Sequence, residues 1–418
     1  MTSSMPSKGT PATLFPRSGG FAGSAMQPLR SLVARLMKRL HVGAMTVELP
    51  DGSRIEGRGM LAGPHVTVVL HRWRPLLRLV LQGDIGFARS YRDADWSTPD
   101  LTALLLLALR NESHWMAAIR GSKAMRGIDR LRHLMRRNTR RGSRENISFH
   151  YDLGNEFYAQ WLDPELIYSS ALWRSGAESL EEAQANKLAR IVELLDLPAD
   201  ASVLEIGCGW GALAIALARD RRAHVTGLTL STEQLAHARL RATKDGVKSL
   251  LDLRLRDYRD VRGTYDRIVS IEMLEAVGER FWPGYFDTLR QRLKPGGLAV
   301  LQVITIDDTQ FQHYRESADF IQRLIFPGGM LPSWGALQAQ AWRAGLAIER
   351  VQSFGESYAT TLVHWRQRFM RAWPAIEAMG FDARFRRLWE YYLCYCEAGF
   401  RAGRVDVGLF TLRHCDPE

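Results

Sequence analysis

Cysteine is scarce in this chain of 418 residues, and the few cysteines are badly spaced for a disulfide framework or a metal site. The four are Cys208, Cys394, Cys396 and Cys415. None of them forms a Cys-x-x-Cys pair or a cluster with metal-ligand spacing. The sequence therefore argues against a disulfide-rich secreted protein, and it predicts no metal site and a reducing, cytoplasmic location.

Long apolar runs are also lacking. The longest, residues 101–109, is about half of the roughly 20 residues that a membrane-spanning helix needs, and it contains Thr102. We expect no segment of the chain to cross a bilayer.

Acidic residues are absent from the start of the chain, where the first is Glu48. Residues 1–26 are rich in Ser, Gly, Pro and Ala and have neither helix nor strand periodicity. We expect these residues to be a disordered tail. An organellar transit peptide and a flexible bacterial tail both fit this composition.

Acids are almost missing again from residues 120–144, which carry ten Lys or Arg against the single acid Asp129 and so supply most of the net charge of +11. Met125, Ile128 and Leu131 follow at helical spacing. We predict a basic amphipathic linker over residues 121–146 that holds the protein peripherally on an anionic membrane surface, the inner face of the membrane. A solvated basic linker and a nucleic-acid contact are the alternatives.

Residues 27–120 combine helix and strand patterns. Apolar residues between Leu29 and Leu40 recur at helical spacing, strand-like stretches follow at 44–49 and 65–71, and a Leu-rich helix is expected at 98–110. The pattern predicts a small N-terminal α+β accessory domain, associated with lipid or membrane.

Strand and helix patterns alternate through residues 147–418, which predicts an α/β fold with a doubly wound sheet. Seven strands with a late, separated last one match the layout of the class I methyltransferases. The expected strands are 202–206, 223–228, 250–254, 266–271, 297–304, 347–353 and 405–412.

Three alternating glycines, Gly207, Gly209 and Gly211, directly follow the first of these strands and precede a helical pattern. Glycine allows positive φ and lets a ligand approach the backbone, and the following helix offers unpaired N–H groups. The turn therefore predicts a nucleotide-type pocket. Glu205, two residues before it, suits the cationic amino-acid end of S-adenosylmethionine and would repel a pyrophosphate. A dinucleotide remains an alternative, since the spacing also satisfies the looser dehydrogenase pattern.

Several further motifs lie in order between about residues 85 and 412. With them, the chain resembles the cyclopropane-fatty-acyl-phospholipid synthases and the related mycolic acid cyclopropane synthases. The stretches that carry the resemblance are the glycine turn, Tyr151-Asp152-Leu153-Gly154-Asn155, Tyr168-Ser169-Ser170-Ala171, Leu228-Thr229-Leu230-Ser231, Met273-Leu274-Glu275-Ala276-Val277-Gly278, Ile325-Phe326-Pro327-Gly328-Gly329 and Cys396-Glu397-Ala398-Gly399-Phe400-Arg401.

The resemblance implies how S-adenosylmethionine is held. Trp210 would pack on the cofactor at the glycine turn, and Tyr168 would contact its methionine end. The ribose would meet Thr229, Leu230 and Gln234, and the adenine would meet Asp257 and Tyr258. Without the resemblance, Gln234 reads as a solvent-facing helical residue.

The resemblance also implies the reaction: methyl transfer to the cis double bond of an unsaturated phospholipid acyl chain, followed by proton loss and closure of a cyclopropane ring. In that family a bound bicarbonate takes the proton, and its binding groups would here be Glu275, Tyr358 and Cys396. Two positions depart from the family, because Gln302 stands for a histidine and Ser170 for a cysteine. Neither substitute can relay a proton as histidine does.

These departures leave methyl transfer intact and put ring closure in question. Cyclopropanation is the first expectation, and a methyl- or methylene-branched chain is the alternative. A nucleic-acid methyltransferase and a non-catalytic lipid-binding protein are more distant alternatives, and we expect no nucleic-acid partner. Whether two copies pair as a homodimer stays open.

Overall fold

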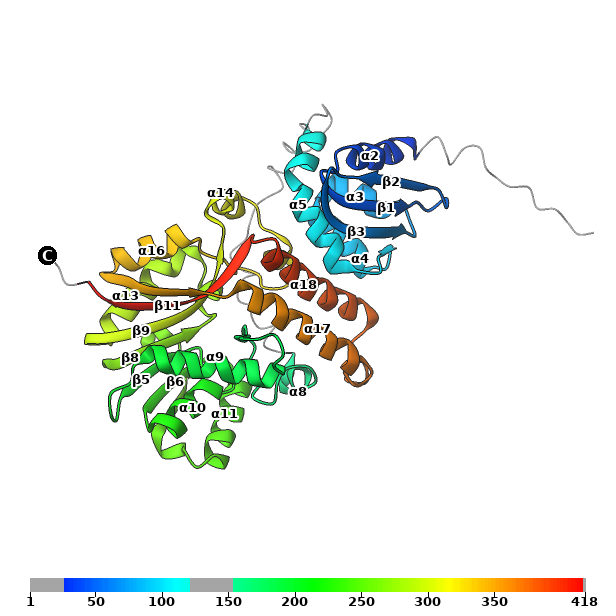
Figure 1. Ribbon diagram of the computed structural model, residues 1–418. Coiled ribbons are helices and arrows are strands. Elements are labelled where there is room, and N and C mark those ends of the chain that lie inside the picture. Colours follow the sequence, from blue (N-terminus) through cyan, green and yellow to red (C-terminus); the bar gives the residue numbers. More distant parts are fainter. Residues whose placement is uncertain (1–25, 121–152, 416–418) are drawn as a thin grey trace, which may run out of the picture.

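The computed structural model describes residues 26–120 and 153–415 (Figure 1). The expected N-terminal tail, except Met26, and the whole basic linker at 121–146 lie outside the described residues, as does Tyr151.

The larger part of the chain is built on a seven-stranded sheet, which confirms the predicted fold class. The strand order is β10-β11-β9-β8-β5-β6-β7, and only β11 runs antiparallel to its neighbours. Each of the seven expected strands is present within a few residues of its predicted bounds. They are β5 (Ser202–Ile206), β6 (His224–Thr229), β7 (Leu251–Leu255), β8 (Tyr265–Ile271), β9 (Leu293–Ile306), β10 (Leu346–Ser353) and β11 (Val405–His414).

Helices cover both faces of this sheet (Figure 1), so its central strands are buried on both sides. This explains why four consecutive residues of β5, 203–206, are buried instead of every second one. The longer helices are α9 (Leu180–Leu195), α10 (Ala212–Arg221), α11 (Thr232–Lys244), α13 (Trp282–Arg292), α16 (Trp334–Arg343), α17 (Gly355–Ala378) and α18 (Ala383–Arg401). The shorter ones are α8 (Gly154–Ala159), α12 (Leu274–Val277), α14 (Asp308–Glu316) and α15 (Phe320–Leu324), with 3-10 turns η1 (Lys248–Leu250), η2 (Tyr258–Asp260) and η3 (Glu279–Phe281).

Residues 26–120, here called the N-terminal unit, form a second sheet of order β2-β1-β3-β4 with four helices. The expected helix–strand–strand–helix order is present, but β2, β4, α3 and α4 were not predicted. β2 is an edge strand of alternating exposure in which Arg54, Glu56 and Arg58 face solvent, so its sequence lacks an apolar face. The elements are α2 (Gln27–Lys38), β1 (Val42–Glu48), β2 (Arg54–Arg58), β3 (Leu61–Leu70), α3 (Arg74–Gln82), α4 (Asp84–Arg92), β4 (Trp96–Ser97) and α5 (Leu101–Arg120).

Helix α18 joins the two parts of the molecule (Figure 1). Arg387 donates hydrogen bonds to the backbone carbonyls of Tyr91 and Trp96, at 2.5 and 2.9 Å. Deeper in the interface, the Thr102 hydroxyl donates to the buried Glu397 carboxylate at 2.8 Å. These contacts fix the N-terminal unit against α18.

Candidate active site

The glycine turn leaves its backbone open, as the sequence predicts. Gly207, Gly209 and Gly211 have φ angles of +82°, +52° and +88°, which favour glycine. The N–H groups of Gly207 and Cys208 both donate to the Leu228 carbonyl, which ties the turn to the adjacent strand β6. Apart from its two chain neighbours, none of the described residues has an atom within 4 Å of a Cβ built on Gly209. A ligand can therefore approach the main chain there.

Glu205 lies buried at the end of β5, under this turn. Within the described residues its Oε2 atom has no hydrogen-bond partner. Burial raises the pKa of the carboxyl to about 8, opposed by a backbone hydrogen bond and by the charge of Lys187. Burying a carboxylate oxygen without a hydrogen-bond partner costs free energy, and a cation that pairs with it removes that cost. The ammonium group of S-adenosylmethionine is such a cation.

The residues expected along the rest of the cofactor follow the next two strands. Thr229 and Gln234 are buried and joined by a 2.8 Å hydrogen bond, so Gln234 does not face solvent. Leu230 is 72% exposed, so its side chain offers an apolar surface to a ring of the bound cofactor.

After β7, Asp257 accepts hydrogen bonds from the backbone and side chain of Arg259, which lower the pKa of its carboxyl. Tyr258 beside it is half-buried. Within the glycine turn, Trp210 is buried and donates to Asn155 at 2.6 Å. All these groups lie at the carboxyl edge of the parallel strands, where open α/β sheets bind ligands.

A second cluster lies at the carboxyl end of β8, and its centre is Glu272, which sequence reasoning did not single out. Glu272 Oε1 accepts the Ser170 N–H at 2.8 Å and Gln302 Nε2 at 2.7 Å. Glu272 Oε2 accepts the Tyr358 hydroxyl at 2.7 Å. Tyr358, expected to bind bicarbonate, and Ser170 and Gln302, at the two altered family positions, thus already donate to a carboxylate of the chain itself. These donors are not free for a bicarbonate ion.

Glu275, on α12, lies beside this cluster. Its Oε1 accepts the Ile304 N–H at 2.6 Å, and its Oε2 has no hydrogen-bond partner within the described residues. Burial and the neighbouring charge of Glu272 raise the pKa of Glu275 to about 8. Ionising both of these part-buried, interacting carboxyls is unfavourable, so the pair holds a proton near neutral pH.

Tyr168 and Cys396 complete the set of expected site residues. The Tyr168 hydroxyl is 2.9 Å from that of Tyr392, and both rings line the same cavity as Glu272 and Glu275. Cys396 also lines it, and burial raises the pKa of the thiol above its usual range. A thiol held neutral in this way is a poor nucleophile.

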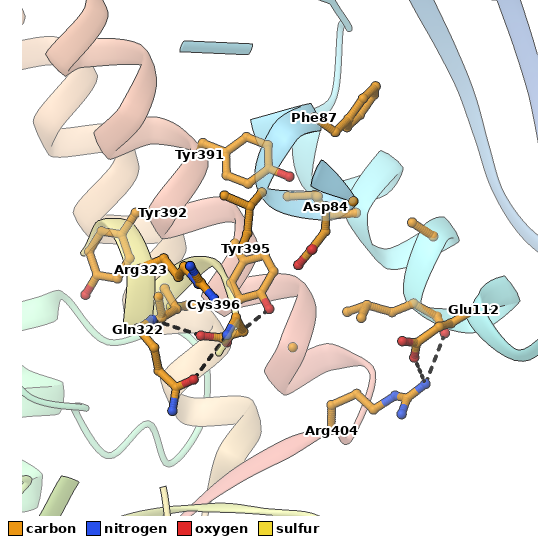
Figure 2. Close-up of a pocket in the computed structure, with 18 of the residues that line it drawn as sticks. Asp84, Phe87, Glu112, Gln322, Arg323, Tyr391, Tyr392, Tyr395, Cys396 and Arg404 are labelled. Atoms are coloured by element: carbon orange, nitrogen blue, oxygen red, sulfur yellow. Dashed lines mark hydrogen bonds and ion pairs between the residues drawn. The ribbon is translucent and has the colours of Figure 1, made fainter. Parts of the chain in front are cut away.

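The cavity has a volume of about 1270 Å³ and reaches from the two carboxyls into the N-terminal unit. Figure 2 shows Tyr391, Tyr395 and Cys396 of α18 on one side of it, with Asp84 and Phe87 of α4 across from them. Its far wall is apolar and includes Val33 and Met37 of α2, Val47 of β1, and Val68 and Leu70 of β3. A mostly apolar space of this size exceeds the roughly 300–1,000 Å³ of ordinary small-molecule pockets and suits a long hydrocarbon.

The sequence did carry a signal for Glu272. An acid directly after the apolar strand β8 stands at the ligand-binding edge of the sheet. Its partners Ser170 and Gln302 are the two positions where the chain departs from the resembling family, and both touch this carboxylate. Residues 170, 272 and 302 therefore lie in one pocket.

Comparison with known proteins places these features in a family. The family profile described as mycolic acid cyclopropane synthetase matches residues 138–410. The chain is 38% identical to the tuberculostearic acid methyltransferase of Mycobacterium tuberculosis over 362 residues, covering 83% of each protein. It is 36% identical to the cyclopropane-fatty-acyl-phospholipid synthase of Escherichia coli over 334 residues, covering 79% of this chain and 83% of that protein.

A solved structure agrees with this assignment. The mycolic acid cyclopropane synthase CmaA1, crystallised with SAH and CTAB, matches with a TM-score of 0.60 and 30% identity over 64% of this chain and 97% of its own. The cofactor of the present protein is accordingly S-adenosylmethionine, and the buried Glu205 under an open glycine turn fits it. The chain belongs to the mycolic acid cyclopropane synthase family of S-adenosylmethionine-dependent methyltransferases, enzymes that modify lipids.

Proposed function

We propose that this enzyme methylates the cis double bond of an unsaturated phospholipid acyl chain and releases a methyl- or methylene-branched chain rather than a cyclopropane. The observation that carries the proposal is the Glu272 carboxylate, which occupies the hydrogen-bond donors expected to hold bicarbonate. The relatives support a fatty acyl substrate, since one is a tuberculostearic acid methyltransferase and another is a cyclopropane-fatty-acyl-phospholipid synthase.

The described residues bind and enclose the reacting groups. S-adenosylmethionine, when bound, supplies a methyl group activated by a positive sulfur. We infer that Glu205 holds its ammonium and that the alkene, a weak nucleophile, lies in the apolar cavity beside Tyr168 and Tyr358. As the new C–C bond forms, positive charge develops on the acyl chain, and the aromatic faces stabilise it by cation–π attraction. The dry walls keep water from capturing that cation.

Proton loss decides the product. Closing a ring requires a base to take a proton from the newly added methyl group at once. Burial raises the pKa of Glu272, but its oxygens already accept three hydrogen bonds, so its carboxylate is less free to reach the new methyl group than an unbound anion is. A hydride then shifts from the methylated carbon to the adjacent cationic carbon. Loss of a proton from a carbon next to the relocated charge gives an alkene on a branched chain, and the Glu272 carboxylate receives that proton.

Ring closure is the second candidate, and one observation favours it. Glu275 Oε2 has no partner within the described residues and lines the same cavity, so a base is available there when this carboxyl is ionised. The Escherichia coli relative is named a cyclopropane synthase.

We also propose that residues 27–120 form a domain separate from the catalytic part at 147–418 and that it holds the distal part of the acyl chain. Its sheet and helices supply the apolar far wall of the cavity. Within the described residues, no helix is long and apolar enough to cross a membrane. A peripheral contact with an anionic cytoplasmic membrane surface would give the acyl chain access to the cavity.

The product assignment is tested with two variants at one position. Glu272→Gly removes the carboxylate and suits the φ of +49° at this residue, and it frees the three donors for an added anion. With bicarbonate present, we expect mass spectrometry to find a larger share of cyclopropane product. Glu272→Gln keeps the size of the side chain and serves as the control, with no gain of cyclopropane. A predominantly cyclopropane product from the unaltered enzyme would overturn the branched assignment.

A further inference from the structure

A buried lysine on α9 has no ion-pair partner within 4 Å among the described residues. Lys187 is 1% exposed, and its Nζ donates a hydrogen bond to the Ser169 hydroxyl at 2.6 Å. Burying an ammonium without a paired carboxylate is costly, so a position of this kind calls for a function.

Gln184, one turn earlier on α9, binds the same residue. It is also 1% exposed, and its Nε2 donates to the Ser169 backbone carbonyl at 3.0 Å. The two side chains therefore hold Ser169 by its hydroxyl and by its main chain. A residue fixed at two points from one rigid helix has little freedom to shift.

Ser169 lies between two residues of the active site. Before it, Tyr168 lines the cavity and contacts the Tyr392 hydroxyl. After it, the Ser170 N–H donates to Glu272. A displacement of Ser169 would move both the Tyr168 ring and the Ser170 N–H that binds Glu272. Small displacements of groups around the reacting atoms lower the reaction rate strongly.

Charge adds a second effect. Three carboxylates act on Lys187: those of the buried Asp163 and Glu205 and that of the part-buried Glu272. Burial lowers the pKa of Lys187 to about 8, whereas these carboxylates favour its charged form. In return, the ammonium favours the ionised forms of Glu272 and Glu205, the proposed proton acceptor and the cofactor-binding acid.

We propose that Gln184 and Lys187 are positioning residues, which hold the Tyr168–Ser170 segment in its reactive geometry, and that Lys187 also supplies the positive charge that balances Glu272 and Glu205. The part that concerns Glu272 rests on the proposed function, and the part that concerns Glu205 rests on the cofactor alone.

Three variants separate the effect of holding Ser169 in place from the effect of the positive charge of Lys187. Lys187→Met removes both, Lys187→Arg keeps the charge, and Ser169→Ala removes only the hydroxyl that Lys187 contacts. Lys248→Met, at an exposed lysine on η1, is the matched control. Each is assayed with S-adenosylmethionine and vesicles of monounsaturated phospholipid, and cofactor binding is measured separately by calorimetry.

For Lys187→Met we expect kcat to fall by about 10- to 100-fold and the rise of activity with pH to move to higher pH. The rise moves to higher pH because the loss of a nearby cation makes ionisation of the Glu272 carboxyl less favourable. The other titratable groups facing Glu272 are Glu275 on α12, Tyr358 on α17 and Cys396 on α18, and they are unchanged. Lys187→Arg should restore the position of that rise, and Ser169→Ala should lower kcat without moving it.

Measuring cofactor binding distinguishes a failure of the role given to Lys187 from a failure of the proposed function. We expect Lys187→Met to bind S-adenosylmethionine more weakly near neutral pH, whether or not the acyl substrate is the right one. A folded Lys187→Met variant with the pH profile, kcat and cofactor affinity of the unaltered enzyme would overturn the inference. An unaltered enzyme that methylates no acyl chain would overturn the proposed function instead.

Discussion

At the scale of single residues, one side chain changes the chemistry of the site. Glu272 adopts a φ of +49°, which is uncommon for a residue other than glycine, and its carboxylate holds Ser170, Gln302 and Tyr358 together. Backbone strain of this kind persists where the surroundings impose it, often at functional sites. Sequence reasoning found the three partners but not their centre, because contacts among residues 170, 272, 302 and 358 are set by the fold and not by spacing.

Glu205 offers the most direct single-residue test of the cofactor site. Glu205→Gln removes the charge but keeps the shape, so we expect S-adenosylmethionine to bind roughly 10- to 100-fold more weakly, the range for a hydrogen bond to a charged group. Isothermal titration calorimetry measures this. Asp257→Asn, where the carboxylate already pairs with Arg259, is a suitable comparison and should have a smaller effect. Equal losses at the two positions would contradict the role of Glu205.

Glu275 predicts a dependence of stability on pH. Its pKa is raised to about 8 in the folded protein, above its unfolded value, so the folded state binds the extra proton. The stability this provides is complete below about pH 4 and is lost as the pH rises through about 8. Glu275→Gln cannot lose that proton, so its Tm should fall less than that of the unaltered protein between about pH 6 and pH 9. Parallel Tm curves for the two proteins would show that the carboxyl is not buried in its neutral form.

At the scale of elements, the carboxyl ends of consecutive strands determine where the site forms. The sequence predicts the seven strands of the larger sheet because buried parallel strands read as continuous apolar runs between glycine and charged turns. It misses α3 and α4 of the N-terminal unit, since these nine-residue helices leave little room for a repeating pattern.

Helix α18 carries the attachment of the N-terminal unit, and Arg387 is its best-placed contact. Arg387→Ala removes two hydrogen bonds to backbone carbonyls and a cation–π contact at 3.9 Å from the Tyr91 ring centre. We expect a loss of about 2–4 kcal/mol in the free energy of unfolding, measured by chemical denaturation.

Arg384→Ala is the matched control on the same helix. Its side chain is 63% exposed and pairs at 2.6 Å with Asp93, which keeps its ion pairs to Arg78 and Arg92 when Arg384 is removed. An ion pair to such an exposed arginine contributes at most about 1 kcal/mol. Similar losses for the two variants would mean that α18 is not held to the N-terminal unit by Arg387.

At the scale of the whole molecule, the cavity joins two parts of the chain that the sequence treats separately. The family profile begins at residue 138, so the N-terminal unit lies outside it, yet residues of that unit form the far wall of the same cavity. No local pattern predicts this, because the wall arises only when α2, β1 and β3 pack beside α18.

Narrowing the far wall should therefore alter the choice of substrate. Leu36, on α2, is partly buried and lines the cavity. For Leu36→Trp we expect turnover of long acyl chains to fall several-fold more than turnover of short ones, in competition assays read by mass spectrometry. Leu240→Trp, at a leucine that is 71% exposed and lies outside this cavity, should leave the ratio unchanged. An unchanged ratio for Leu36→Trp would remove the N-terminal unit from the acyl path.

The reaction we propose for this enzyme is transfer of a methyl group to a carbon–carbon double bond. Incubating the enzyme with methyl-labelled S-adenosylmethionine and vesicles of monounsaturated phospholipid, then locating the label by mass spectrometry, tests it directly. We predict label on the acyl chain, in a branch carbon at the former double bond. Label on the head group, or none on the lipid while the cofactor is consumed, would contradict it.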